Sequence, residues 1–166
     1  SSKVDPLRLE RGVVLETIDT PWDAIVPDNS TDQPQVGDFI SLVDPALLAS
    51  GVERSLFLEE NGFYWLRRHG RRPLLLHRTK LPAIMSIDLL ITTGKIRGLV
   101  ELEPEQGVNT LIEAGSSLGF NRLTLRLSME PSIHPQRQRE LDRQLPENGK
   151  FGFVVRLPSG LLAICG

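Results

Sequence analysis

The sequence predicts an α+β fold in which strands dominate: a mixed or largely antiparallel sheet, or a partial barrel, with two to three short helices. Three observations support this prediction. Twelve Pro and fourteen Gly in 166 residues imply many turns and short elements. Aromatic residues make up 5% of the chain, so Leu, Ile and Val must supply most of the core. Several segments alternate apolar and polar residues, as half-buried strands do. The length suits a single domain over residues 1–166.

The N-terminal segment predicts strands followed by a long connection. Residues 6–18, PLRLERGVVLETI, form one strand or two strands on either side of Arg11 and Gly12. Residues 19–38 are rich in Pro, Asp, Asn and Ser and predict a long loop, in which Trp22 is the expected anchor.

A short strand and a short helix come next. Residues 39–43, FISLV, read as a strand. The helix begins after Asp44, which suits the N-cap, with Pro45 at the first helical position, where a missing N–H costs nothing. Gly51 is expected to end it.

Residues 52–78 predict a three-strand β-meander. Residues 52–59 alternate as the first strand, and Asn61-Gly62 fits a type I′ turn before the second. His69-Gly70 marks the next turn, after which RPLLLHR returns as the third strand. If Tyr64 and Leu66 face the core, Trp65 and Arg67 face outward.

Residues 96–128 predict a βαβ unit. Strands are expected at 86–92 and 96–102, with the TTGK stretch as a turn between them. The helix that follows has Asn109 as N-cap, an apolar face and Gly119 just past its end. NRLTLRLS then alternates as a strand with its Leu residues inward and Arg122 and Arg126 outward.

Residues 131–166 predict a helix and a C-terminal hairpin. The helix is polar and has two apolar anchors, Leu141 and Leu145, so it is either solvated or lies against a partner. FGFVVRL and LLAIC, separated by PSG, form the hairpin.

Charge is segregated along the chain, although the net charge is only −2. Residues 1–60 hold twelve acidic and four basic residues, residues 61–100 hold eight basic residues and Asp88, and residues 101–166 are nearly balanced. In one interpretation the acidic first third packs beside the basic middle, and the charges offset each other. In the other, the basic cluster stays open and binds an anion.

The meander places this basic cluster at a hairpin tip. Four Arg residues and one His cannot all be buried, so the RRHGRR turn should protrude. Arg side chains present planar, bidentate donors that suit carboxylate and phosphate groups. The predicted anion- or partner-binding residues are Arg67, Arg68, His69, Arg71, Arg72, Trp65 at the root, and Arg78.

No motif in the sequence meets the standard of a catalytic signature. There is no GxGxxG before a helix, no GxxxxGK[ST] and no GxSxG. Glu101 and Glu103 are spaced to share a strand face like an acid/base pair, but an exposed strand edge also explains them. His77 is either a buried structural residue or part of a pocket. The three His residues lack metal-ligand spacing and Cys165 is a single cysteine, so we expect neither a metal nor another cofactor.

These features predict a non-enzymatic binding or assembly module that engages an anionic partner through the basic hairpin tip. An acidic protein surface is favoured over nucleic acid because the whole chain is slightly acidic, and a homo-oligomer or larger assembly is a related option. The alternative is a small enzyme that acts on an anionic carboxylate or phosphate metabolite with Arg, His and Glu. No run of 18 apolar residues occurs, and the single cysteine favours the cytoplasm. The segment could also be one domain of a larger protein.

Overall fold

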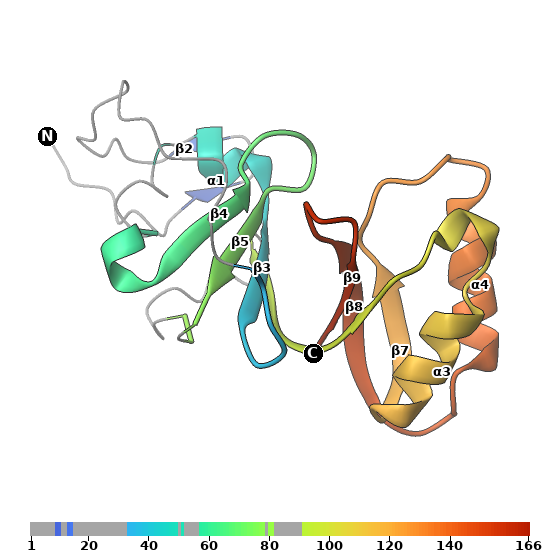
Figure 1. The fold of residues 1–166 in the computed structure, drawn as a ribbon. Helices are drawn as coiled ribbons and strands as arrows, with labels where there is room; N and C mark the ends of the chain where they lie inside the picture. Colours follow the sequence, from blue (N-terminus) through green and yellow to red (C-terminus); the bar gives the residue numbers. More distant parts are fainter. Residues whose placement is uncertain are drawn as a thin grey trace, which may run out of the picture. The chain divides into compact units, whose positions relative to one another are not determined.

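The chain is described here from a computed structural model, which covers the backbone of residues 9–10 and 13–14 and all atoms of 33–49, 51, 57–78, 80–81 and 91–166. Within these residues seven strands form one mixed sheet in the order β4-β5-β3-β6-β9-β8-β7. A few short helices accompany it (Figure 1). The prediction of a strand-dominated α+β fold is therefore confirmed.

Most neighbouring strands of the sheet are antiparallel. β5 (Leu74–His77) pairs in this way with both β3 (Phe39–Val43) and β4 (Phe63–Arg67). β9 (Leu162–Cys165) pairs likewise with both β6 (Ile91–Val100) and β8 (Lys150–Arg156). β7 (Phe120–Leu125) lies parallel to β8 at one edge. This parallel pair makes the sheet mixed.

The chain folds into two compact units. The N-terminal unit comprises Ser1–Pro34 and Asp38–Thr93, and the C-terminal unit comprises Gln35–Gly37 and Gly94–Gly166. Strand β6 contributes its first residues to the N-terminal unit and the rest to the C-terminal unit. The organisation of the chain as a single domain stays a prediction.

Local sequence signals explain the first elements. β1 (Leu9–Glu10) pairs antiparallel with β2 (Val13–Val14), so two short strands flank Arg11 and Gly12. In the predicted loop, residues 33–38 contain neither helix nor strand, and residues 19–32 lie outside the described part. Helix α1 (Pro45–Ala49) follows Asp44, whose Oδ1 accepts a hydrogen bond from the Ala46 N–H at 2.9 Å.

The meander differs from the prediction at its first strand. Residues 52–56 lie outside the described residues, and Glu59–Asn61 form a 3-10 helix, η1, instead of a strand end. Gly62, with φ of 86°, closes this helix, so Asn61-Gly62 is not a type I′ hairpin turn. β4 and β5 do form a hairpin, and the other neighbour of β5 is β3.

Strand β6 runs without a break through the TTGK stretch, so the predicted turn there is wrong. Gly94 instead allows Phe153 and Gly166 to pack closely against strand β6. A Cβ at this position would lie 2.8 Å from Cε1 of Phe153 and 2.9 Å from the backbone nitrogen of Gly166. Glycine is thus required by neighbours that are distant in the sequence, a signal that local pattern cannot reveal.

The C-terminal unit contains the predicted βαβ connection. The chain passes from β6 through η3 (Pro104–Gln106) and α3 (Asn109–Ser117) to β7, and β9 and β8 lie between the two strands. Val108, not Asn109, occupies the N-cap, and it makes no side-chain cap bond. Gly119 follows the helix with φ of 84°, as predicted for the residue past its end.

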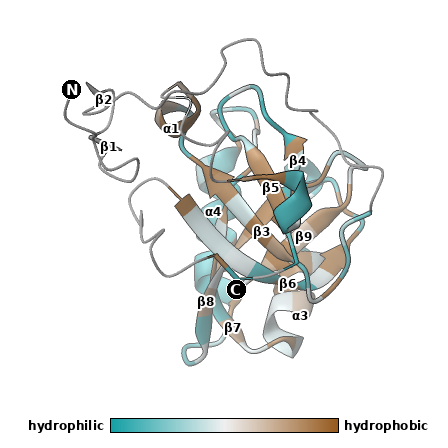
Figure 2. Ribbon diagram, turned by 90° about the vertical axis from the view of Figure 1, so that its left-hand side faces the viewer, coloured by the Kyte–Doolittle hydropathy of each residue, from teal (hydrophilic) through white to brown (hydrophobic). Residues whose placement is uncertain are grey.

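Helices α3 and α4 (His134–Gln144) pack on one face of the C-terminal strands (Figure 1). Leu111 of α3 and both predicted anchors of the polar helix, Leu141 and Leu145, join a core with Leu123 and Leu125 of β7. Figure 2 shows the contrast in composition, with brown on β3 and β5 and teal on α4. α4 and the β8–β9 hairpin lie within residues 131–166, where a helix and a hairpin were expected.

A side chain of α4 replaces a strand partner at the free edge of β7. Gln138 Oε1 accepts a hydrogen bond from the Leu125 N–H at 2.8 Å, and its Nε2 donates to the Leu123 carbonyl at 2.8 Å. His134 Nε2 donates to the Leu125 carbonyl at 3.0 Å. These bonds satisfy edge groups that would otherwise be open to another strand.

Replacing Gln138 with Met should lower the free energy of unfolding by about 1–3 kcal/mol, because a backbone group of each of the buried residues Leu123 and Leu125 loses its partner while the side-chain volume is kept. Urea denaturation measures the change. Gln136→Met is the matched control on the same helix, since Gln136 is exposed. Equal stability of the two variants would show that Gln138 does not secure the edge.

In the described part of the chain, no helix is both long enough and apolar enough to cross a membrane.

Candidate functional site

The basic turn, defined as Arg67–Arg72, connects β4 to β5. His69 and Arg71 are exposed at its tip, whereas Arg67, Arg68 and Arg72 are half-buried. Gly70 has φ of 95°, a conformation that glycine adopts without strain, and this lets the chain reverse here. The sequence therefore located the tip of the hairpin correctly.

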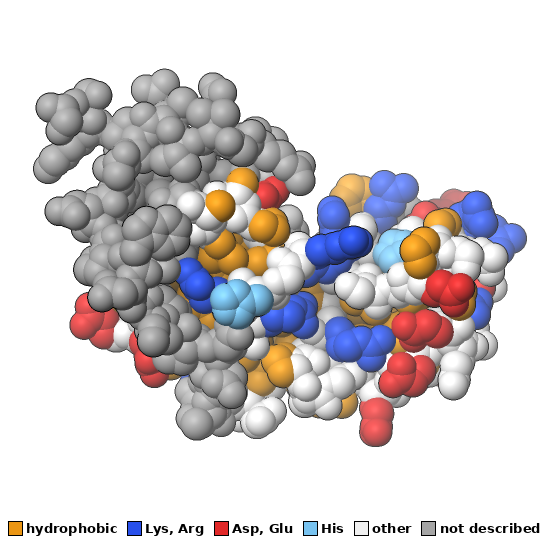
Figure 3. Space-filling model, turned by 90° about the horizontal axis from the view of Figure 1, so that it is seen from above, with side chains coloured by type: hydrophobic (Ala, Val, Ile, Leu, Met, Phe, Trp, Pro, Cys, Tyr) orange, Lys and Arg blue, Asp and Glu red, His pale blue; other side chains and the backbone are white. Residues whose placement is uncertain are grey.

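A hydrogen bond across the turn fixes its base. Arg67 Nε donates to the Arg72 carbonyl at 3.1 Å. Burial, and then the nearby charge of Arg72, lowers the pKa of Arg67. The charges of Arg67 and Arg72 are therefore close enough to interact. On the face seen in Figure 3, a pale-blue His side chain lies beside blue Lys and Arg side chains.

The basic residues also interact within the chain. Arg67, Arg68, His69 and Arg72 each take part in a further polar or electrostatic interaction, so the turn is not a set of isolated cations. Arg78 lies past the end of β5, where its Nε is 3.5 Å from Oδ1 of Asp38. In this pair, an acidic residue from residues 1–60 offsets the charge of a basic residue from residues 61–100. A partly exposed pair of this kind contributes little to stability.

Trp65 does not stand at the root of the basic turn, and the prediction of an outward-facing indole is wrong. The side chain is 3% exposed and packs with Phe57, Phe63 and Leu75. Its ring meets that of Phe57 edge-on, with centroids 6.0 Å apart. Trp65 lies on the same core face as Phe63 two residues before it, so the strand has the opposite parity from the one expected. The register shift between Trp65 and Arg67 accompanies the additional burial of Leu66.

His77 belongs to a buried polar network in the N-terminal unit. Its Nε2 lies 2.8 Å from Oγ of Ser41, which lies 2.7 Å from Oγ1 of Thr93. Both His77 and Ser41 are fully buried, and the imidazole stacks 5.5 Å from the ring of Phe39. A Ser–His contact suits nucleophilic catalysis only where substrate can reach it, so full burial favours the structural role for His77.

The other candidate groups for chemistry are also engaged or shielded. Glu103 and Glu105 each have a carboxylate oxygen 3.8 Å from the guanidinium of Arg156, an arrangement that joins two acids to one base rather than pairing them for acid/base work. Burial raises the pKa of the Cys165 thiol to about 12, so it is a poor nucleophile at neutral pH. Across the described residues, no cluster of three His, Cys, Asp or Glu side chains could hold a metal ion.

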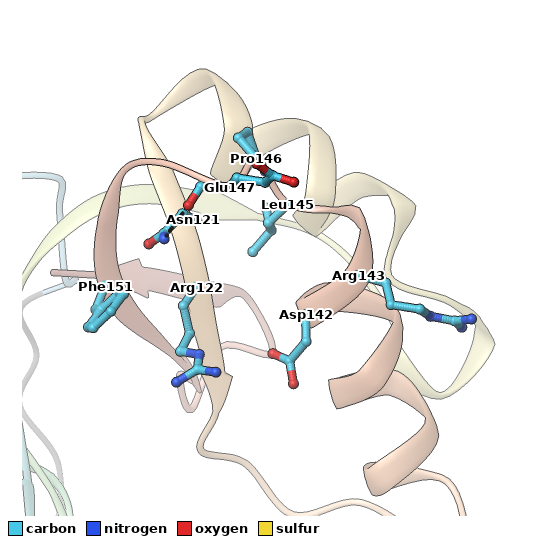
Figure 4. Close-up of a pocket in the computed structure, with 8 residues that line it drawn as sticks. All are labelled: Asn121, Arg122, Asp142, Arg143, Leu145, Pro146, Glu147 and Phe151. Carbon is cyan, nitrogen blue, oxygen red and sulfur yellow. Dashed lines mark hydrogen bonds between the residues drawn. The ribbon is translucent and has the colours of Figure 1, made fainter.

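A pocket of about 440 Å³ lies in the C-terminal unit, between the β7–β8 pair and the end of α4 (Figure 4). Arg122 and Asp142 extend toward the space between β7 and α4, whereas Arg143 extends away from it. The Asn121 amide helps to fix the wall, since its Nδ2 donates to the Glu147 carbonyl at 3.1 Å. The lining residues are Asn121, Arg122, Asp142, Arg143, Leu145, Pro146, Glu147 and Phe151.

Sequence reasoning missed this pocket, although one signal was available. The alternation in NRLTLRLS correctly placed Arg122 on the outward side of its strand. Phe151, however, has the same strand parity as the buried Phe153, so its 69% exposure was not predictable from pattern. Asp142 enters from a helix, and no local feature indicates that it faces β7.

Comparisons with known proteins bear on the fold alone. No family model matches this sequence, and no curated protein matches it significantly. A solved structure described as a putative methyltransferase from Porphyromonas gingivalis W83 is similar, with a TM-score of 0.50 and 13% sequence identity. The similarity covers 92% of this chain and 35% of that chain, so this chain spans about a third of that protein.

Proposed function

We propose that this chain is a non-enzymatic binding or assembly module whose basic turn engages an acidic protein surface. The observation that carries the proposal is the concentration of four Arg residues within the basic turn, with Arg71 exposed at its tip. A carboxylate-rich partner could bind exposed guanidinium groups such as that of Arg71 in bidentate fashion. The polar helix, α4, is a second candidate contact.

The proposal includes a reducing, cytoplasmic setting. Cys165 is the one cysteine of the sequence, and it is buried as a free thiol. A chain that relies on no disulfide suits such a compartment.

Charge reversal in the second half of the basic turn tests the proposal. The double variant Arg71→Glu, Arg72→Glu changes the local charge by four units and leaves the Arg67 side chain, which braces the turn, in place. Captured partners, identified by mass spectrometry after affinity purification, should be lost by at least tenfold, because opposite charges at an interface become like charges. The circular dichroism spectrum should be unchanged.

The matched control is Arg139→Glu, Arg143→Glu on α4, which makes the same charge change at two exposed positions of the C-terminal unit. This variant should retain the partner if the basic turn provides the contact. Equal capture by the wild type and the turn variant would contradict the proposal, and loss in the α4 variant alone would assign the contact to the helix.

A further inference from the structure

Two opposite charges, those of Arg122 and Asp142, face the pocket of the C-terminal unit, and Oδ1 of Asp142 also accepts a hydrogen bond from Gln138 Nε2 at 3.1 Å. Elsewhere in that unit, Arg137 pairs with Glu140, and Arg156 pairs with Glu103 and Glu105. Arg122 and Asp142 form no ion pair with each other, although both extend toward the same space in Figure 4. A ligand that offers acceptors to Arg122 and donors to Asp142 could bridge them.

An aromatic platform lies beside this charged gap. Phe151 is 69% exposed, so much of its ring is open to solvent. Arg122 Cζ lies 5.8 Å from the centroid of its ring, so the guanidinium and the ring together offer a surface on which a flat group can stack.

Strand β8 also carries a cation next to Phe151 in the sequence. Lys150 precedes Phe151 in β8, is exposed, and has its Nζ 4.7 Å from the centroid of the Phe120 ring. Neighbouring residues of a strand point to opposite faces, so this ammonium group does not line the pocket. The pocket itself combines an aromatic ring for stacking, one donor group and one carboxylate acceptor.

We infer that the pocket binds a guanine nucleotide, either free or within a single strand of nucleic acid. Guanine presents O6 and N7 as acceptors, the groups that Arg binds bidentately. Its N1–H and N2–H₂ donors lie on the adjoining edge and suit the Asp142 carboxylate. Adenine lacks the O6 acceptor and the N1–H donor, so it cannot bridge the two charges. An amino-acid zwitterion could match the charges, but it does not require the exposed ring.

Titration calorimetry of the full chain with GMP and AMP tests the inference, and GMP should bind at least tenfold more tightly. Asp142→Asn and Arg122→Gln should each weaken GMP binding by about tenfold. Arg139→Gln makes the same charge change as Arg122→Gln at an exposed position of α4 that does not line the pocket, so it should change GMP affinity less than twofold. Thermal melts verify that each variant folds.

Phe151→Leu keeps an apolar side chain and removes the flat ring, so it should weaken GMP binding by at least threefold. Short oligonucleotides that contain guanine show whether the natural ligand is a free nucleotide or a nucleic-acid strand. If they bind more tightly than GMP, the ligand is a strand; if they bind equally well, it is the free nucleotide. Equal affinity for GMP and AMP, or binding of glycine in place of GMP, would overturn the inference. The site is independent of the basic turn, so Arg71→Glu, Arg72→Glu should bind GMP like the wild type.

Discussion

Replacing Gly152 with Ala should destabilise the protein by at least about 3 kcal/mol, or prevent folding, because the added methyl group has no space. Gly152 lies in β8, and a Cβ there would overlap the Cys165 carbonyl of β9 and lie 2.6 Å from Cε1 of Phe120. The carbonyl is backbone and cannot rotate away, so the strands themselves would have to separate. Urea denaturation measures the change.

Gly98→Ala is the matched control in strand β6 of the same sheet. A Cβ at Gly98 would meet only Cδ1 of Leu118, at 3.0 Å, and this side-chain end can shift. Its cost should stay below about 1 kcal/mol, since Ala also reduces the entropy of the unfolded chain. If Gly152→Ala were as stable as Gly98→Ala, the close approach of β8, β9 and Phe120 would be incorrect.

Replacing His77 with Ala should lower the free energy of unfolding by about 2–4 kcal/mol, through loss of a buried ring and creation of a cavity. The imidazole lies 5.5 Å from the Phe39 ring and 5.4 Å from the Phe63 ring, and its Nε2 contacts Ser41. Chemical denaturation with fluorescence detection provides the measurement.

His69→Ala supplies the control, because His69 is exposed in the turn of the same hairpin and should cost less than about 0.5 kcal/mol. Ser41→Ala separates the hydrogen bond from the ring packing and should cost about 1–3 kcal/mol. A loss at His77 no larger than at His69 would refute the structural role of the buried network.

Local chemistry predicted much of the fold. Asp44 and Pro45 specified the start of α1, because the carboxylate caps the Ala46 N–H and proline needs no partner there. The alternation in β7 predicted that Leu123 and Leu125 face the core. Each of these features depends on residues within a few positions of one another, which is why the sequence alone was sufficient.

The errors arose where distant residues decide the outcome. The register shift after Trp65 depends on how β4 pairs with β5, and Gly94 is required by Phe153 and Gly166 rather than by a turn. The pocket likewise joins Arg122 of β7 to Asp142 of α4. The position of the basic turn could be predicted, because its four Arg residues flank His69 and Gly70 in the sequence. Its interactions with other parts of the chain could not be predicted from the sequence.

The central claim, that the basic turn holds an acidic partner by charge, is tested most directly by the salt dependence of the affinity for the captured partner. Surface electrostatics weaken as the screening length falls from about 30 Å at 0.01 M salt to about 10 Å at 0.1 M. Affinity measured by surface plasmon resonance should fall at least tenfold over this range for the wild type, and much less for Arg71→Glu, Arg72→Glu. An affinity that is independent of salt, with equal values for the two proteins, would contradict the claim.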